Sequence, residues 1–301
     1  MAAGPKKVVY AALAGNLAIA VTKFVAAAIT GSSAMLSEGV HSVVDTGNQA
    51  LLLYGMRRAK VPADERFPFG RGKEIYFWSF VVALLVFALG AGISFYQGVH
   101  HLLYPAEVER PYVNYAVLAF AAIFEFGSWW VAFRQFRAKA GERGVLEGVR
   151  RGKDPTDFAV LLEDSAALAG IAVAFLGVLL GQITGDARFD GAASMVIGLI
   201  LAATATWLAR ETKGLLIGES ANREVVAEIK RLAGSYREIE RVNEVLTMHV
   251  GPEYILANIS VDIACDVPRN RAHAIMDELD VRIKKADARV KRVFIESQNV
   301  C

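Results

Sequence analysis

Long apolar stretches dominate the first two thirds of the chain, and they set the expected fold. A helix that crosses a bilayer needs about 20 mostly apolar residues. Six segments of this kind are present, at 8–29, 34–54, 76–103, 113–133, 158–181 and 191–208. The second segment is the most polar, because it also carries three ionisable residues. The pattern predicts a bundle of six transmembrane helices.

The last part of the chain has the shorter alternation of an ordinary soluble domain. Helical spacing covers 224–235 and 270–286, and strand-like alternation covers 242–250, 255–264 and 289–298. A turn signal joins the first two strands. The predicted order is α-β-β-α-β, as in ferredoxin-like domains. We therefore expect an α-helical membrane domain at 1–212 and a cytoplasmic α+β domain at 213–301.

Charge in the connecting segments predicts the orientation in the membrane. Six basic residues lie between the second and third predicted spans and seven between the fourth and fifth, whereas the other links hold at most one. The positive-inside rule then places both termini and the basic loops in the cytoplasm. A net charge of +2 gives no indication of nucleic-acid binding. No organelle-targeting extension is evident, which favours a bacterial plasma membrane.

The second predicted span contains an unusual polar face within the stretch LSEGVHSVVD. Glu38, His41, Asp45 and Asn48 fall within an arc of about 80° on a helix. One ionised Asp at the bilayer centre costs roughly 2.5–3.5 kcal/mol. These groups are therefore expected to face protein, water or an ion. The fifth predicted span adds a second acidic group, Glu163 and Asp164, with Asp157 two turns earlier.

This combination of side chains suits a divalent metal ion. An imidazole with several carboxylates and no thiolate fits Zn²⁺, with Mn²⁺, Fe²⁺, Co²⁺ and Ni²⁺ as alternatives. His41 and Asp45 are spaced at i and i+4, so both can reach one ion. The structural alternative is that the acids cap helices or pair with Lys23 and Lys213. The two cysteines suggest neither a disulfide framework nor a zinc finger.

Several motifs together resemble the cation diffusion facilitator family of divalent-metal transporters. They are the Asn16 to Lys23 pattern, GSSAMLSEGVHSVVD, FPFGRGKEIYFW, FDGAASMVIGLIL and GLLIGESA. The segment EDSAAL is most similar to the branch with mitochondrial zinc transporters and their bacterial relatives. The resemblance implies a homodimer that exchanges a divalent ion, most often zinc, for protons and moves it out of the cytoplasm. It implies a secondary active transporter, not an enzyme, with no prosthetic group.

The resemblance also implies a four-residue transport site, two residues from the second span and two from the fifth. His41 and Asp45 match the first pair, and Asp164 matches the second member of the other pair. Val160 stands where the remaining ligand is expected, and valine cannot ligate. Glu163 is the preferred fourth ligand, with Asp157 or a water as alternatives.

Other polar residues leave further hypotheses open. Glu125, in the fourth predicted span, could serve a proton path or pair with Lys23. Arg71 replaces a histidine that binds an ion in some relatives, so no ion is expected in that loop. The tail histidines, His249 and His273, are expected on the surface. The rival functions are a membrane-anchored metal receptor and a zinc hydrolase using Glu38; the tail has few ligands and no HExxH run is present, which argues against both.

Overall fold

The computed structural model describes the backbone of residues 5–140 and 155–298, with side chains for 16–138 and 159–297. The chain forms two compact units. The first consists of Met1–Gly55 with Phe77–Thr212, and the second of Met56–Tyr76 with Lys213–Cys301.

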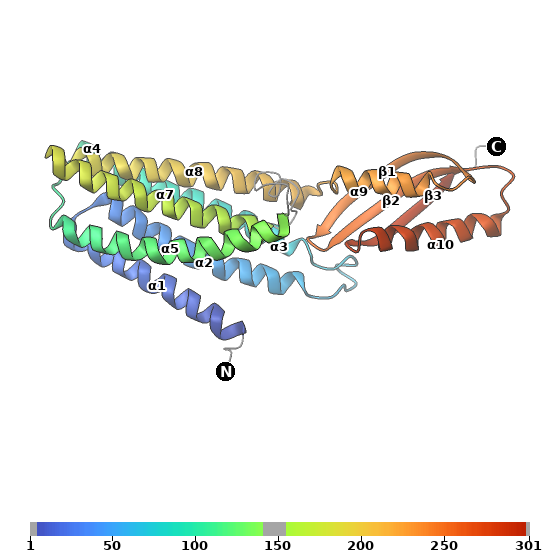
Figure 1. Ribbon diagram of the computed structural model, residues 1–301, viewed down its shortest axis with the longest axis horizontal. Helices are drawn as coiled ribbons and strands as arrows, with labels where there is room; N and C mark the ends of the chain where they lie inside the picture. Colours follow the sequence, from blue (N-terminus) through green and yellow to red (C-terminus); the bar gives the residue numbers. More distant parts are fainter. Residues whose placement is uncertain (1–4, 141–154, 299–301) are drawn as a thin grey trace. The chain divides into compact units, whose positions relative to one another are not determined.

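The first unit is a bundle of long helices (Figure 1). Each predicted span lies within one helical stretch of the described chain. The bounds are α1 Pro5–Thr30, α2 Ser33–Ala59, α3 Glu74–Leu85 continued by η1 Val86–Ala91 and α4 Gly92–Leu103, α5 Pro111–Ala140, α7 Pro155–Thr184 and α8 Arg188–Ile217.

Four stretches are long and apolar enough to cross a membrane, by length and composition. They are Glu74–Leu103, Pro111–Ala138, Ala159–Thr184 and Arg188–Ile217. In α1 the side chains are described only from Asn16 onward, and the part Asn16–Thr30 is apolar but shorter than a membrane span. α2 is not among the four stretches, because its polar residues lower its hydropathy.

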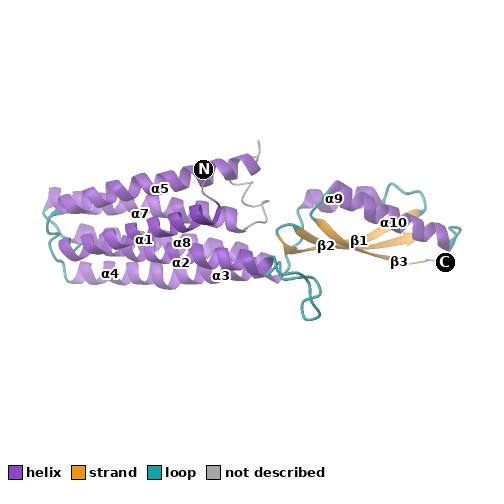
Figure 2. Cartoon of the chain, turned by 90° about the horizontal axis from the view of Figure 1, so that it is seen from below, coloured by secondary structure: helices purple, strands orange, loops and turns teal. Residues whose placement is uncertain are grey.

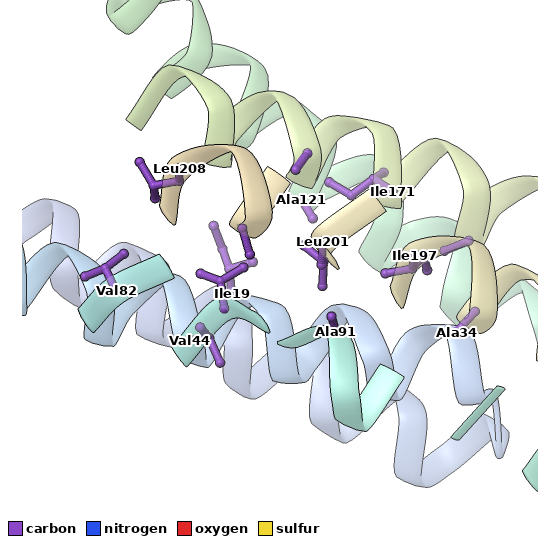
Figure 3. Packing of buried hydrophobic residues seen from close by; sticks show 14 of the residues in the cluster. Ile19, Ala34, Val44, Val82, Ala91, Ala121, Ile171, Ile197, Leu201 and Leu208 are labelled. Atoms are coloured by element: carbon purple, nitrogen blue, oxygen red, sulfur yellow. The ribbon is translucent and has the colours of Figure 1, made fainter. Parts of the chain in front are cut away.

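Small and branched side chains fill the interior of the bundle. Figure 3 shows buried residues from all these helical stretches meeting there, among them Ile19 of α1, Val44 of α2 and Leu201 of α8. Alanines such as Ala34 and Ala121 are almost fully buried. Helices surrounded by lipid gain little from hydrophobic burial against one another, so close packing of small residues is what holds them together.

The stretch Glu74–Leu103 contains a turn of π-helix, η1, at its middle. The α-helical pattern breaks at Val86 and resumes at Gly92. Such wide turns occur mostly singly inside α-helices and often near functional sites. On the far side of η1, α4 approaches α8 closely: a side chain on Gly98 would overlap the backbone nitrogen of Met195.

The second unit contains a three-stranded sheet and two helices in the order α9 Arg223–Ala233, β1 Ile239–Gly251, β2 Tyr254–Ile263, α10 Arg269–Ala286 and β3 Val290–Gln298. The order matches the predicted α-β-β-α-β. β2 lies in the centre, antiparallel to β1 and parallel to β3. Figure 2 shows both helices on one face of the sheet.

Apolar side chains fill the space between the sheet and its helices. Ile255, Ile259, Ile275 and Leu279 are all completely buried there. Two expectations for this unit were wrong. His249 is buried at 1% exposure within β1 instead of lying on the surface, because its position alternates toward the covered face of the sheet. Cys265 takes part in a disulfide bond.

The segment between α2 and α3 also belongs to the second unit, and Arg71 makes several contacts within it. Arg71 pairs with Asp64 at 2.6 Å and stacks over the ring of Phe67 at 4.4 Å. The hydrogen bond from Arg71 lowers the pKa of Asp64 below its ordinary range. An arginine therefore holds the carboxylate that an ion would bind if this loop carried a metal site.

Candidate metal site

Polar side chains follow one side of α2 along most of its length, and we call them the α2 stripe. Most recur at intervals of three or four, which keeps them on one face of the helix. Several of them form hydrogen bonds with residues of α1, α7 and α8. The stripe consists of Ser33, Ser37, Glu38, His41, Ser42, Asp45, Asn48 and Gln49, of which the first five and Asn48 are buried.

His41 and Asp45 face each other near the middle of the stripe. Their side chains approach to 3.3 Å between Nε2 and Oδ2, and His41 is 1% exposed. Within the described part of the chain, both ring nitrogens of His41 and Oδ1 of Asp45 have no hydrogen-bond partner. Buried polar atoms are normally satisfied. These three atoms are therefore free to act as ligands.

A small polar cavity adjoins Asp45. It leaves about 10 Å³ of free space, close to the least that holds one water molecule. Four of the lining residues are carboxylates, which come from three helices. The lining residues are Asn16, Ser42, Asp45, Gln49, Glu125, Val160, Glu163 and Asp164.

Neighbouring helices fix the two acids of α7. Asn48 donates from Nδ2 to Oε1 of Glu163 at 3.1 Å, and Ser128 of α5 donates to Oδ2 of Asp164 at 2.8 Å. Both carboxylates are less than 10% exposed. Each keeps its second oxygen for another partner. Hydrogen bonds of this kind orient metal ligands and tune their affinity.

The structure brings together most of the predicted site. Asp45, Glu163 and Asp164 line one cavity, and His41 contacts Asp45 without lining that cavity itself. The side chain of Asp157 lies outside the described residues. Among the side chains that are described, no three histidine, cysteine or acidic groups already converge as a metal site. Small side-chain movements around the cavity are needed before one ion could contact all of its acids.

Sequence reasoning missed several contributors. Ser42, Gln49 and Ser128 line the cavity or bond its acids, yet each is a common small or amide residue without a distinctive spacing. The sequence position of Gln49 could have identified it, because it lies four residues after Asp45 and so on the same face of the helix.

Glu125 also lines the cavity. The alternative that it pairs with Lys23 is not what the structure has, because among the described residues Lys23 makes its ion pair with Glu38, at 3.0 Å.

A cavity of this composition can exchange cations. Its carboxylates can bind protons or a divalent ion. Because metal ligands must be deprotonated, an ion that binds here releases protons. Ionisable residues inside a membrane segment commonly mark an ion or proton path.

Fold and site together define a multi-pass membrane protein with a cluster of carboxylates in its interior. Residues 9–217 match the cation efflux transmembrane domain. The match covers more than half of the chain, so the protein belongs to the cation efflux family. It includes every helix that contributes to the α2 stripe and the cavity.

Individual relatives refine this assignment. The chain is 31% identical over 261 residues to the human protein named "Proton-coupled zinc antiporter SLC30A9, mitochondrial", covering 86% of this chain and 46% of that protein. It is 23% identical over 297 residues to the manganese efflux system protein MneP of Bacillus subtilis, covering 96% and 94%. It is 29% identical over 220 residues to metal tolerance protein C4 of Arabidopsis thaliana. The chain spans about half the length of the SLC30A9 proteins it matches.

Proposed function

We propose that this protein is a secondary active transporter that exchanges a divalent metal ion, zinc in the first place, for protons. The observation that carries the proposal is the cavity between α2, α5 and α7, which is lined by Asp45 and by the buried acids Glu163 and Asp164. Family membership and the similarity to a zinc antiporter support the same conclusion.

The proposed ligands are His41, Asp45 and Asp164, with Glu163 as the fourth. Glu163 is favoured because it is bonded by Asn48 and lines the cavity, where Val160 offers no ligand atom. An imidazole with carboxylates suits zinc. Manganese is the alternative substrate, because the manganese efflux relative matches the chain over nearly its full length.

Proton coupling follows from the chemistry of these ligands. Carboxylates and imidazole bind either a proton or the metal, so the two compete for the same atoms. Metal bound on the side with fewer protons is released on the side with more.

The remaining features of the proposal concern topology and assembly. We propose six transmembrane spans at 1–212, with both termini in the cytoplasm of a bacterial cell, and a ferredoxin-like dimerisation domain at 213–301. One face of the sheet supports assembly with a second copy. Leu246, Asn258 and Phe294 form one row across the strands on the face away from the helices, and both apolar members are about half exposed.

Metal flux into proteoliposomes tests the proposal. Purified protein would be reconstituted with and without an imposed pH gradient, and zinc, manganese, iron(II), cobalt and nickel compared. We expect gradient-driven uptake of zinc, abolished in Asp164→Ala. Asp186→Ala is the matched control, since Asp186 is an exposed acid outside the cavity. Uptake of manganese without uptake of zinc would make manganese the substrate. Uptake at the native rate by Asp164→Ala would refute the proposed metal site.

A further inference from the structure

Lys23 lies in α1 with its side chain completely buried. Its Nζ donates to Oε2 of Glu38 at 3.0 Å and to Oγ of Ser42 at 2.8 Å. Both partners belong to the α2 stripe, one turn apart, and His41 lies between them in the sequence. Glu38 is also completely buried. An apolar pair of similar volume is often as stable as a buried ion pair, so stability alone does not account for these two charges.

The ion pair occupies a particular place along the stripe. Ser42 and Asp45 line the cavity, and Glu38 lies one turn closer to the N-terminus of α2. Beyond it the stripe continues only with hydroxyl groups: Ser37 lies 3.1 Å from Ser194 of α8, and Ser33 lies at the start of the helix. An ion that leaves the cavity toward this end of α2 meets the Lys23–Glu38 pair first.

We propose that the Lys23–Glu38 ion pair closes the ion pathway on the side of the α2 N-terminus. The inference rests on the proposed transport function. The ammonium group lies on the polar route and repels a divalent cation while it is bound to Glu38. Oε1 of Glu38 is buried and has no hydrogen-bond partner among the described residues. That oxygen becomes the next ligand for an ion once Lys23 moves aside.

The test removes both charges and keeps the side-chain lengths. Lys23→Met combined with Glu38→Gln would be reconstituted, with Zn²⁺ as the probe. Native protein is expected to accumulate zinc only with a pH gradient. The double variant is expected to let zinc in without a gradient at least tenfold faster than native protein, and to lose gradient-driven accumulation. Native coupling in the double variant would overturn the proposal.

A matched variant separates closure from general loosening of the bundle. Thr30 of α1 donates to Asn114 of α5 at 2.9 Å, and both are completely buried outside the α2 stripe. Thr30→Val combined with Asn114→Leu also removes a buried polar link to α1. It is expected to keep native coupling. A leak equal to that of the charge variant would show that any lost contact opens the bundle, and would overturn the proposal.

A second perturbation covers the case in which the charge variant does not fold. A side chain on Gly170 of α7 would overlap Oε1 of Glu38, whereas Gly127 of α5 faces open space. Gly170→Ala is therefore expected to displace Glu38 and raise the gradient-independent zinc leak, and Gly127→Ala to leave it unchanged. Equal leaks in folded protein would overturn the proposal.

The same vesicles distinguish this inference from the proposed function. If native protein shows no gradient-driven metal flux, the transport function fails, and the closing pair fails with it. If Asp164→Ala abolishes a flux that the Lys23, Glu38 and Gly170 variants leave unchanged, only the closing pair is refuted.

Discussion

Replacing Asp190 by alanine should weaken the bundle far more than its place near a helix end suggests. Asp190 lies in the first turn of α8 and is 1% exposed. Its Oδ2 accepts hydrogen bonds from the backbone nitrogens of Ser33 and Ala34, at 2.6 and 3.3 Å, and from Oγ of Ser33 at 2.8 Å. Its Oδ1 accepts from Oγ of Ser32 at 2.5 Å. One carboxylate of α8 thus caps α2.

The expected loss can be summed from these contacts. An N-cap is worth about 1 kcal/mol, with measured values up to about 2. A hydroxyl bond to a charged oxygen adds roughly 1.5 kcal/mol or more. Only the bond from Ser32 is counted, because Oγ of Ser33 keeps a neighbour in Ser194 at 3.1 Å. Asp190→Ala should therefore lower the free energy of unfolding by about 3 kcal/mol, and Asp190→Asn by about half as much, since the amide keeps one acceptor oxygen.

Reversible unfolding in mixed detergent micelles, followed by tryptophan fluorescence, measures this difference. Asp186→Ala is the control: Asp186 also accepts a backbone hydrogen bond at the start of α8, from Arg188 at 2.9 Å, but it is exposed. Its loss should cost less than about 1 kcal/mol. If the two alanine variants unfold alike, the buried cap does not hold α2 and the reasoning is refuted.

Two further predictions concern other parts of the chain. Asn48→Ala should weaken zinc binding by on the order of tenfold in calorimetry, because it frees Glu163, and unchanged affinity would exclude Glu163 as a ligand. The hydrogen bond from Arg289 lowers the pKa of Asp287. The ionised Asp287 therefore stabilises the fold at neutral pH, and this stabilisation is lost as the pH falls below about 4. Asp287→Asn should accordingly unfold at a lower temperature than native protein at pH 7 but not at pH 2, and equal differences at both would contradict this.

Features that depend on local periodicity were predictable from the sequence. Apolar runs of about 20 residues indicated the helices, and alternation indicated the strands of the second unit. The i and i+4 spacing of His41 and Asp45 placed both on one side of a helix, and in the structure their side chains approach to 3.3 Å. In each case the information lies within a few turns of one element.

Features that depend on distant partners were not predictable. The bond from Ser128 to Asp164 joins residues 36 apart, and the cap on α2 joins residues more than 150 apart. Serine and aspartate at these positions have no spacing that distinguishes them from ordinary polar residues. Glu163 and Asp164 are adjacent in α7, yet both line the cavity, because a long flexible side chain can turn toward a partner such as Asn48.

The π turn η1 explains how one helix can present small residues at a strict interval of four. Val86, Gly90, Ser94 and Gly98 are all buried. In a regular α-helix, four residues advance about 400°, so each step drifts by about 40° and three steps would carry the last residue off the shared face. A wider turn between Val86 and Ala91 takes up part of this surplus rotation. One additional residue in a single turn thus keeps the two halves of the helix in phase, and lets Gly90 and Gly98 both approach α8, beside Leu201 and Met195.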